Sequence, residues 1–254
     1  MKTNKLQFIS VLKVSAFGSK GDYYDSLLYI EQSTTACMPT SHYAQISKIV
    51  EIMFRLRPQS VLDIGIGYGK YGLLAREFLE LWLEYKPYEE RKIRIDGVEA
   101  FPEYINAGHR FYYDEIFIGN ALDKVPTLGQ YDLILIIDVL EHFIEKDGLE
   151  LLKRCKAKAR HILISTPLDV GEQGPVFGNE FERHRFQWKK RHLEQFAPVT
   201  FFWNHHSLLC LIGPEGKRIK RIMSFNGSKI WLRSHFPGLY IFYRKNLRKL
   251  FARE

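Results

Sequence analysis

The sequence contains few cysteines and no long apolar run. Only three of its 254 residues are cysteines, and no two of them form a C-x-x-C pair. Neither a disulfide framework nor a cysteine-bound zinc site is therefore expected, and we predict no bound metal. No run reaches the 18 or so uninterrupted apolar residues that a transmembrane helix needs, so none is predicted. The composition is that of an ordinary globular protein.

The first residues imitate a secretion signal without completing one. In MKTNKLQFISVLKVSA two lysines precede an apolar stretch, but Gln7 and Lys13 interrupt it. No continuous apolar segment of the length that signal peptides use remains. We therefore predict a cytoplasmic protein, with peripheral contact to a membrane as a variant of that prediction.

Acidic residues are scarce at one end of the chain only. Residues 214–254 carry eleven Lys or Arg and two acids, whereas residues 1–213 carry 26 basic and 27 acidic side chains. Electrostatic partners should therefore meet the basic tail. An apolar stripe at helical spacing in the tail predicts an amphipathic helix; its members are Tyr240, Tyr243, Leu247, Leu250 and Phe251. We expect this helix to dock on the body, with membrane-surface contact as the first alternative and nucleic acid as the second.

Strand-like apolar runs alternate with helical patterns through the middle of the chain. The strands are predicted at residues 60–64, 93–99, 115–118, 131–137, 161–165, 199–203 and 207–212. Helical patterns cover residues 73–83, 103–111 and 148–159. This alternation predicts an α/β fold with a Rossmann-like, doubly wound, mostly parallel sheet of seven strands. We divide the chain into an N-terminal extension (1–38), one domain (39–213) and the basic tail (214–254).

The last two strands must pair differently from the others. Only residues 204–206 separate them. A parallel crossover needs a dozen or more residues, so this connection predicts an antiparallel hairpin.

A glycine-rich stretch, VLDIGIGYGKYG at residues 61–72, follows the first strand. Gly65, Gly67 and Gly69 spell G-x-G-x-G, while Gly67, Gly69 and Gly72 spell the dinucleotide signature G-x-G-x-x-G. Alternating glycines after a buried strand allow a tight turn and close approach of the backbone to a ligand. Asp63 adds a carboxylate beside the loop. The loop alone leaves the cofactor undecided.

Three further strands deliver polar residues to the same edge of the sheet. Glu99 ends the second strand, where a carboxylate can accept both hydroxyls of a ribose. Asn120 and Ala121 follow the third strand and can meet an adenine edge, although Asn after a strand is also ordinary turn chemistry. Asp138 ends the fourth strand, beside the crevice in which doubly wound sheets bind ligands.

Together these motifs resemble a class I S-adenosylmethionine (SAM)-dependent methyltransferase of the branch with a D-V-x-E-H motif. The resemblance spans about residues 58–213 and rests on D-x-G-x-G-x-G, the acid of the second strand, G-N-A, D-V-L-E-H and the final hairpin. The resemblance implies SAM as cofactor. Its amino-acid moiety would be contacted by Asp63, Gly65, Gly67 and Gly69, and its ribose by Glu99. Asn120 and Ala121 would contact the adenine, and Asp138 and Val139 would lie near the methyl group. Asn120 stands where the family more often has Asp.

The hairpin separates the two cofactors. In this resemblance an antiparallel strand inserts beside the fifth strand, whereas a nicotinamide domain ends with another parallel strand. We therefore predict SAM, and we interpret Gly72 as a helix position required by close packing.

Candidate bases come from the histidines and one acid. Glu141 and His142 are adjacent and come shortly after the fourth strand. His184 lies in residues 178–196, which we place over the mouth of the crevice together with Glu182 and Trp188. Histidine is the natural base at neutral pH, so Glu141, His142 and His184 are the catalytic candidates, with a capping or core role as the alternative for each.

Only the absence of two sequence motifs limits the class of methyl acceptor. No N-P-P-Y or D-P-P-Y follows the fourth strand, which disfavours amino methylation of adenine or glutamine. We predict methyl transfer to an O or N nucleophile of a small-molecule or glycan-type acceptor. The alternatives are an RNA methyltransferase guided by the basic tail and a catalytically silent SAM-binding scaffold.

Overall fold

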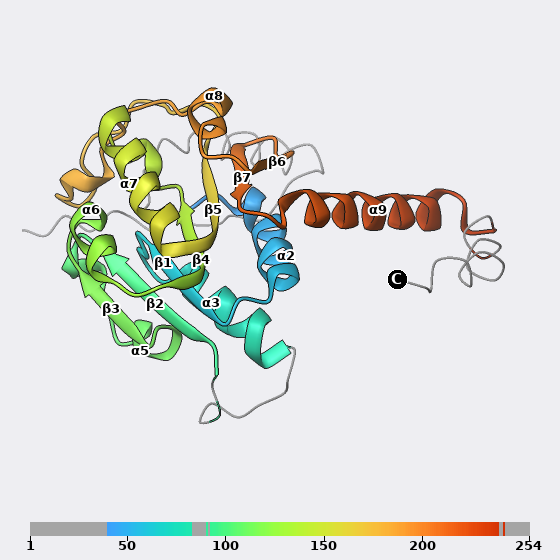
Figure 1. Cartoon of the computed structure of the whole chain (residues 1–254), viewed down its shortest axis with the longest axis horizontal. Helices are drawn as coiled ribbons and strands as arrows, with labels where there is room; N and C mark the ends of the chain where they lie inside the picture. Colours follow the sequence, from blue (N-terminus) through green and yellow to red (C-terminus); the bar gives the residue numbers. More distant parts are fainter. Residues whose placement is uncertain (1–39, 83–89, 91, 239–240, 242–254) are drawn as a thin grey trace, which may run out of the picture. The chain divides into compact units, whose positions relative to one another are not determined.

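The computed structural model describes residues 40–82, 90, 92–238 and 241 (Figure 1). The N-terminal extension predicted at residues 1–38 lies outside this part of the chain. So do the five apolar residues on which the predicted tail helix rests.

A seven-stranded sheet forms the centre of the fold, in the order β3-β2-β1-β4-β5-β7-β6. Its strands are β1 (Ser60–Ile64), β2 (Arg94–Glu99), β3 (Glu115–Ile118), β4 (Tyr131–Ile137), β5 (Ala159–Pro167), β6 (Val199–Phe202) and β7 (Ser207–Ile212). The first five are parallel, and β7 runs antiparallel to both β5 and β6. The predicted fold class, including the final hairpin and its insertion beside the fifth strand, is confirmed.

Helices cover both faces of the sheet (Figure 1). They are α2 (Ile46–Leu56), α3 (Lys70–Arg76), α5 (His109–Tyr112), α6 (Ala121–Lys124), α7 (Glu145–Lys158), α8 (Lys190–Glu194) and α9 (Gly216–His235). A π-helical turn, η2 (Glu77–Leu81), extends α3. Short 3₁₀ turns are η1 (Tyr43–Gln45), η4 (Pro102–Tyr104), η5 (Val125–Thr127), η6 (Leu140–His142) and η7 (Glu180–Glu182).

Three helix predictions were wrong in their bounds. The helix predicted at residues 73–83 begins at Lys70, as α3, and continues as η2. The helix predicted at residues 103–111 is two pieces, η4 and α5, because the Asn106 side chain accepts the Gly108 N–H at 2.9 Å and forms a turn between them. The helix predicted from Gly148 begins three residues earlier, at Glu145. Gly148 is an interior position of α7 that requires glycine, because a Cβ there would lie 2.3 Å from the indole of Trp188.

The core consists of one apolar cluster on each face of the sheet. Along β4, Leu133 and Leu135 belong to one cluster, and Ile134 and Ile136 belong to the other. This alternation follows from the pleat of a strand whose two faces are both covered. Each such side chain contributes about 1.5–3 kcal/mol when fully buried.

Helix α9 leaves the sheet edge and carries much of the basic charge of the tail (Figure 1). Ile219 is buried and Met223 packs on the core, whereas Ile230 and Trp231 further along are exposed. Among the described residues, no helix combines the length and apolarity required to cross a membrane. The domain boundary at residue 213 and the partner of the tail stay predictions.

Candidate functional site

The glycine loop lies at the point where the strand order reverses, between β1 and β4. Gly65, Gly67 and Gly69 all have left-handed backbone angles, with φ of 72°, 50° and 81°. A Cβ on Gly65 would also lie 2.6 Å from a methyl group of Val139. This loop geometry therefore requires glycine. Ligands of doubly wound sheets bind at such a switch point.

Gly72 has a different role from the other three glycines. A Cβ there would lie 2.2 Å from the ring of Tyr113, whose hydroxyl accepts the Gly72 N–H at 3.1 Å. Gly72 thus allows close packing against Tyr113. This agrees with the G-x-G-x-G motif of Gly65, Gly67 and Gly69, which does not include Gly72. The Tyr113 hydroxyl in turn donates to the carboxylate of Asp63 at 2.6 Å.

Asp63 is a buried carboxyl group beneath the loop, 2% exposed. Burial raises its pKa to about 7, the Tyr113 hydrogen bond opposes that rise, and the nearby Glu99 carboxylate adds to it. This carboxyl group is therefore protonated far more readily than that of an exposed aspartate. A cation close by would favour its ionised form.

Glu99 connects the second strand to the glycine loop. Its carboxylate accepts the N–H of Gly67 and the N–H of Phe101, both at 2.9 Å. On the other side of the loop, Nε2 of His109 donates to the carbonyl of Gly67 at 2.9 Å. Burial raises the pKa of Glu99, and these backbone N–H groups lower it. Each carboxylate oxygen still has a lone pair for a further donor.

Sequence reasoning missed two residues that support the glycine loop: His109, which begins α5, and Tyr113, which directly follows it. Both are buried, at 1% and 4% exposure. Their spacing of four residues, which places two side chains on one helix face, is a signal that could have found them.

Asn120 caps the N-terminus of α6, which is the turn role that the sequence left open for it. Its side-chain oxygen accepts the N–H of Leu122 at 2.9 Å at the start of α6, which begins with Ala121. The N–H of Gly119 donates to the carbonyl of Glu99, which keeps this turn beside the end of β2. The contact of Asn120 and Ala121 with adenine stays a prediction.

Asp138 follows β4 and has a strained backbone. Its φ is 53°, a left-handed value that costs a non-glycine residue about 1–3 kcal/mol and is characteristic of functional sites. Its carboxylate accepts the side-chain N–H of Gln45 at 2.6 Å, and Ser207 donates to the oxygen of Gln45 at 2.7 Å. Burial of the carboxyl group raises its pKa. Gln45, from outside every recognised motif, was missed by the sequence analysis.

An aromatic groove of about 280 Å³ opens beside the loop. Its lining is Tyr68, Phe101, Glu103, Tyr104 and Phe177. Tyr68 belongs to the glycine loop itself, and Phe101 follows Glu99 by two residues. The groove can therefore take a flat or sugar-like group next to the glycine loop.

The chain between β5 and α8 returns to the same edge of the sheet. Its Arg185 N–H donates to the carbonyl of Glu141 at 2.8 Å, and the Tyr104 hydroxyl donates to Glu182 at 3.1 Å. Trp188 is fully buried and donates to the carbonyl of Leu140, so it is a core residue. These contacts bring His184 over η6.

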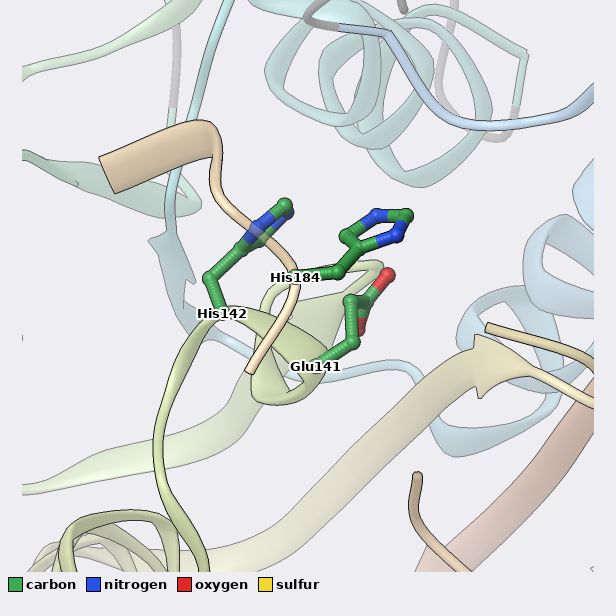
Figure 2. Close-up of side chains that lie close together, drawn as sticks. All are labelled: Glu141, His142 and His184. Carbon is green, nitrogen blue, oxygen red and sulfur yellow. The ribbon is translucent and has the colours of Figure 1, made fainter. Parts of the chain in front are cut away.

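Glu141, His142 and His184 come together although the two histidines are 42 positions apart in the sequence (Figure 2). The ring centroids of the histidines lie 5.2 Å apart. Burial, and then the neighbouring His184, lower the pKa of His142 to about 4, so its ring is neutral at pH 7. Burial and then the Asp138 carboxylate raise the pKa of Glu141 well above its usual range.

Comparison with known proteins gives remote structural likeness only. No protein-family profile and no curated protein matches the sequence. The methyltransferase domain of the bacterial protein CtHen1 is 18% identical, with a TM-score of 0.47 over 67% of this chain and 98% of that one. The N-terminal domain of EvdMO1, crystallised in the presence of SAH and D-fucose, is 14% identical, with a TM-score of 0.48 over 68% and 84%. A Pyrococcus horikoshii protein is 16% identical, with a TM-score of 0.47 over 67% and 88%.

The strand order itself is more informative than these likenesses. Five parallel strands followed by β7, inserted antiparallel between β5 and β6, differ from a nicotinamide domain, which would end with another parallel strand. The chain has a Rossmann-like fold in which the last pair of strands is antiparallel, as its sequence predicts.

Proposed function

We propose that this protein transfers a methyl group from SAM to an O or N nucleophile of a small-molecule or glycan-type acceptor. The contact between Glu99 and the Gly67 N–H carries the proposal, because it joins the acid of β2 and the glycine loop into one site at the switch point. In the resemblance stated above, these two features surround SAM.

The residues present suit this cofactor. Gly65 lies where a Cβ would collide with Val139, which keeps the backbone of the loop exposed for a ligand. Glu99 retains free lone pairs for the ribose hydroxyls, and the buried Asp63 offers a negative charge to the cationic amino-acid end. Asp138 and Val139 flank the methyl side, and Asn120 with Ala121 takes the adenine.

When bound, SAM supplies a methyl group already activated by its positive sulfur. The acceptor lone pair forms the new bond to carbon, the pair of the breaking carbon–sulfur bond stays on sulfur, and the acceptor proton leaves to water or a base. The chain's own task is to align the acceptor, and such alignment can supply about 7–11 kcal/mol. The aromatic groove and the residues Glu141, His142 and His184 are placed to do so.

Glu99→Ala should weaken SAM binding more than tenfold while the protein stays folded, and Asp63→Ala should do the same. Both changes remove a charge that faces the cofactor in this proposal. Isothermal titration with SAM measures the effect. Glu115→Ala is the matched control, because Glu115 is exposed at the opposite end of its strand. Unchanged dissociation constants in both site variants, or binding of NAD in place of SAM, would overturn the proposal.

SAM affinity should fall as the pH drops below about 7. The pKa of Asp63 is about 7 in the ligand-free protein, and a cationic ligand favours the ionised carboxylate. Binding below that pH must therefore expel a proton, which raises the dissociation constant by up to about tenfold per pH unit. Above pH 8 this dependence should vanish. Titrations in two buffers of different ionisation enthalpy report the released proton, and Asp63→Asn should abolish the release.

A further inference from the structure

We propose that Glu141, His142 and His184 bind a divalent first-row transition-metal ion. This proposal departs from the sequence prediction of no bound metal, which considered only the cysteines. The two histidines are far apart in the sequence, and only the return of the chain after β5 brings His184 over η6 (Figure 2).

The three side chains lie close to one another. One potential ligand atom from each lies within 4.8 Å of the other two. In a tetrahedral site two ligands of one ion lie about 3.4 Å apart, since each metal–nitrogen distance is about 2.1 Å. Ligand atoms as far apart as 4.8 Å would therefore have to approach one another by up to about 1.4 Å to close on an ion.

Backbone carbonyls orient both imidazole rings. Nδ1 of His142 lies 3.3 Å from the carbonyl oxygen of Arg183, and Nδ1 of His184 lies 2.7 Å from that of Gly171. A carbonyl can only accept, so these contacts assign the proton of each ring to Nδ1 and leave a lone pair on Nε2. Metal-binding histidines are held in this way, with the second nitrogen donating to a backbone carbonyl or carboxylate.

In the part of the chain that the structure describes, one oxygen of the buried Glu141 carboxyl group lacks a hydrogen-bond donor. Glu141 is 1% exposed, and within the described residues its Oε2 has no hydrogen-bond donor, while the Glu141 backbone and the Thr166 side chain favour the ionised form of the carboxyl group. A buried unsatisfied oxygen of this kind costs about 1–3 kcal/mol or more, and a missing ion is one of its standard explanations. A cation between Glu141 and the histidines would satisfy this oxygen.

The ligand set selects the class of ion. Two imidazoles and one carboxylate suit Zn²⁺, Co²⁺, Mn²⁺ or Fe²⁺, whereas Mg²⁺ and Ca²⁺ prefer sites made of oxygen alone. Three protein ligands leave at least one coordination position open, as in catalytic sites. This last step rests on the proposed function: an open position beside Asp138 would face the acceptor, where the ion would polarise a hydroxyl oxygen.

Cobalt absorption of the full-length protein tests the site. After treatment with a chelator and its removal, titration with Co²⁺ alone should give a saturable visible spectrum at one equivalent, and Zn²⁺ should displace it. His142→Ala, His184→Ala and Glu141→Gln should each weaken Co²⁺ binding at least about tenfold, since even a second-shell partner is worth about 10–100-fold. His205→Ala, on the exposed turn between β6 and β7, is the control and should bind as the parent does.

Two results would overturn the metal site: no saturable Co²⁺ signal, or equal affinity in the parent and His184→Ala. Circular dichroism checks that each variant is folded, and a SAM titration of the same samples separates the two proposals. Lost metal binding with intact SAM binding overturns the metal site alone. Intact metal binding without any SAM binding overturns the proposed function and leaves the metal site standing.

Discussion

Arg76→Ala should lower the free energy of unfolding by about 3–5 kcal/mol, the usual cost of removing one partner of a buried ion pair. The side chain is 4% exposed and its partner Glu80 is 9% exposed, at 2.7 Å. Truncation would leave the Glu80 carboxylate in the interior without its positive partner. Urea unfolding followed by circular dichroism measures the change.

The guanidinium of Arg76 also donates to two backbone carbonyls and to a second carboxylate. It donates to the carbonyls of Ile93 and Tyr112, at 2.9 and 3.0 Å, and to the carboxylate of Asp114 at 3.1 Å. Glu80 accepts the N–H groups of Lys92 and Ile93, both at 2.7 Å. Arg76 therefore joins α3, the start of β2 and the residues before β3.

Arg55→Ala is the matched control for this change. Arg55 forms an i,i+4 pair with Glu51 at the same 2.7 Å, but the two side chains are 21% and 37% exposed. Such pairs contribute about 0.3–0.5 kcal/mol. If both variants lose the same small free energy of unfolding, the buried hydrogen bonds and ion pairs of Arg76 do not stabilise the fold.

The sequence predicted the strands better than the helices because the strands carry an unambiguous signal. Residues 131–137 are apolar except for Asp132, and the observed β4 has the bounds predicted for this run. The short segment between the last two strands excludes a parallel crossover, and the observed hairpin follows. Helix bounds depend on contacts that are distant in sequence, such as the packing of Trp188 on Gly148, and local patterns do not contain them.

The candidate site shows the same division between local and distant signals. The glycine loop and Glu99 are visible as motifs, and the structure joins them by a hydrogen bond. Gln45 reaches Asp138 across 93 residues, and no period or motif announces such a contact. His142 and His184 were each weighed alone as a base, whereas their meaning comes from lying together with Glu141.

His184→Ala should lower the turnover of methyl transfer by about 100-fold or more and leave SAM affinity within about twofold. The large loss follows whether the residue removes a proton or holds an ion, since each role is worth several kcal/mol. SAM affinity should persist because the hydrogen bonds of His184 are to Gly171 and Gln173, not to the glycine loop. Release of S-adenosylhomocysteine with a panel of hydroxyl and amine acceptors measures turnover.

The two roles of His184 predict different rescue behaviour. A metal ligand lost from a three-ligand site can be compensated in part by excess ion, so added Co²⁺ or Zn²⁺ should restore some turnover to His184→Ala, and chelation should silence the parent protein. A general base would give neither effect. His142 itself is a poor general base at neutral pH, since burial lowers its pKa to about 4. His205→Ala, outside the cluster, should retain parental turnover; if His184→Ala retains it too, His184 only holds the segment between β5 and α8 in place.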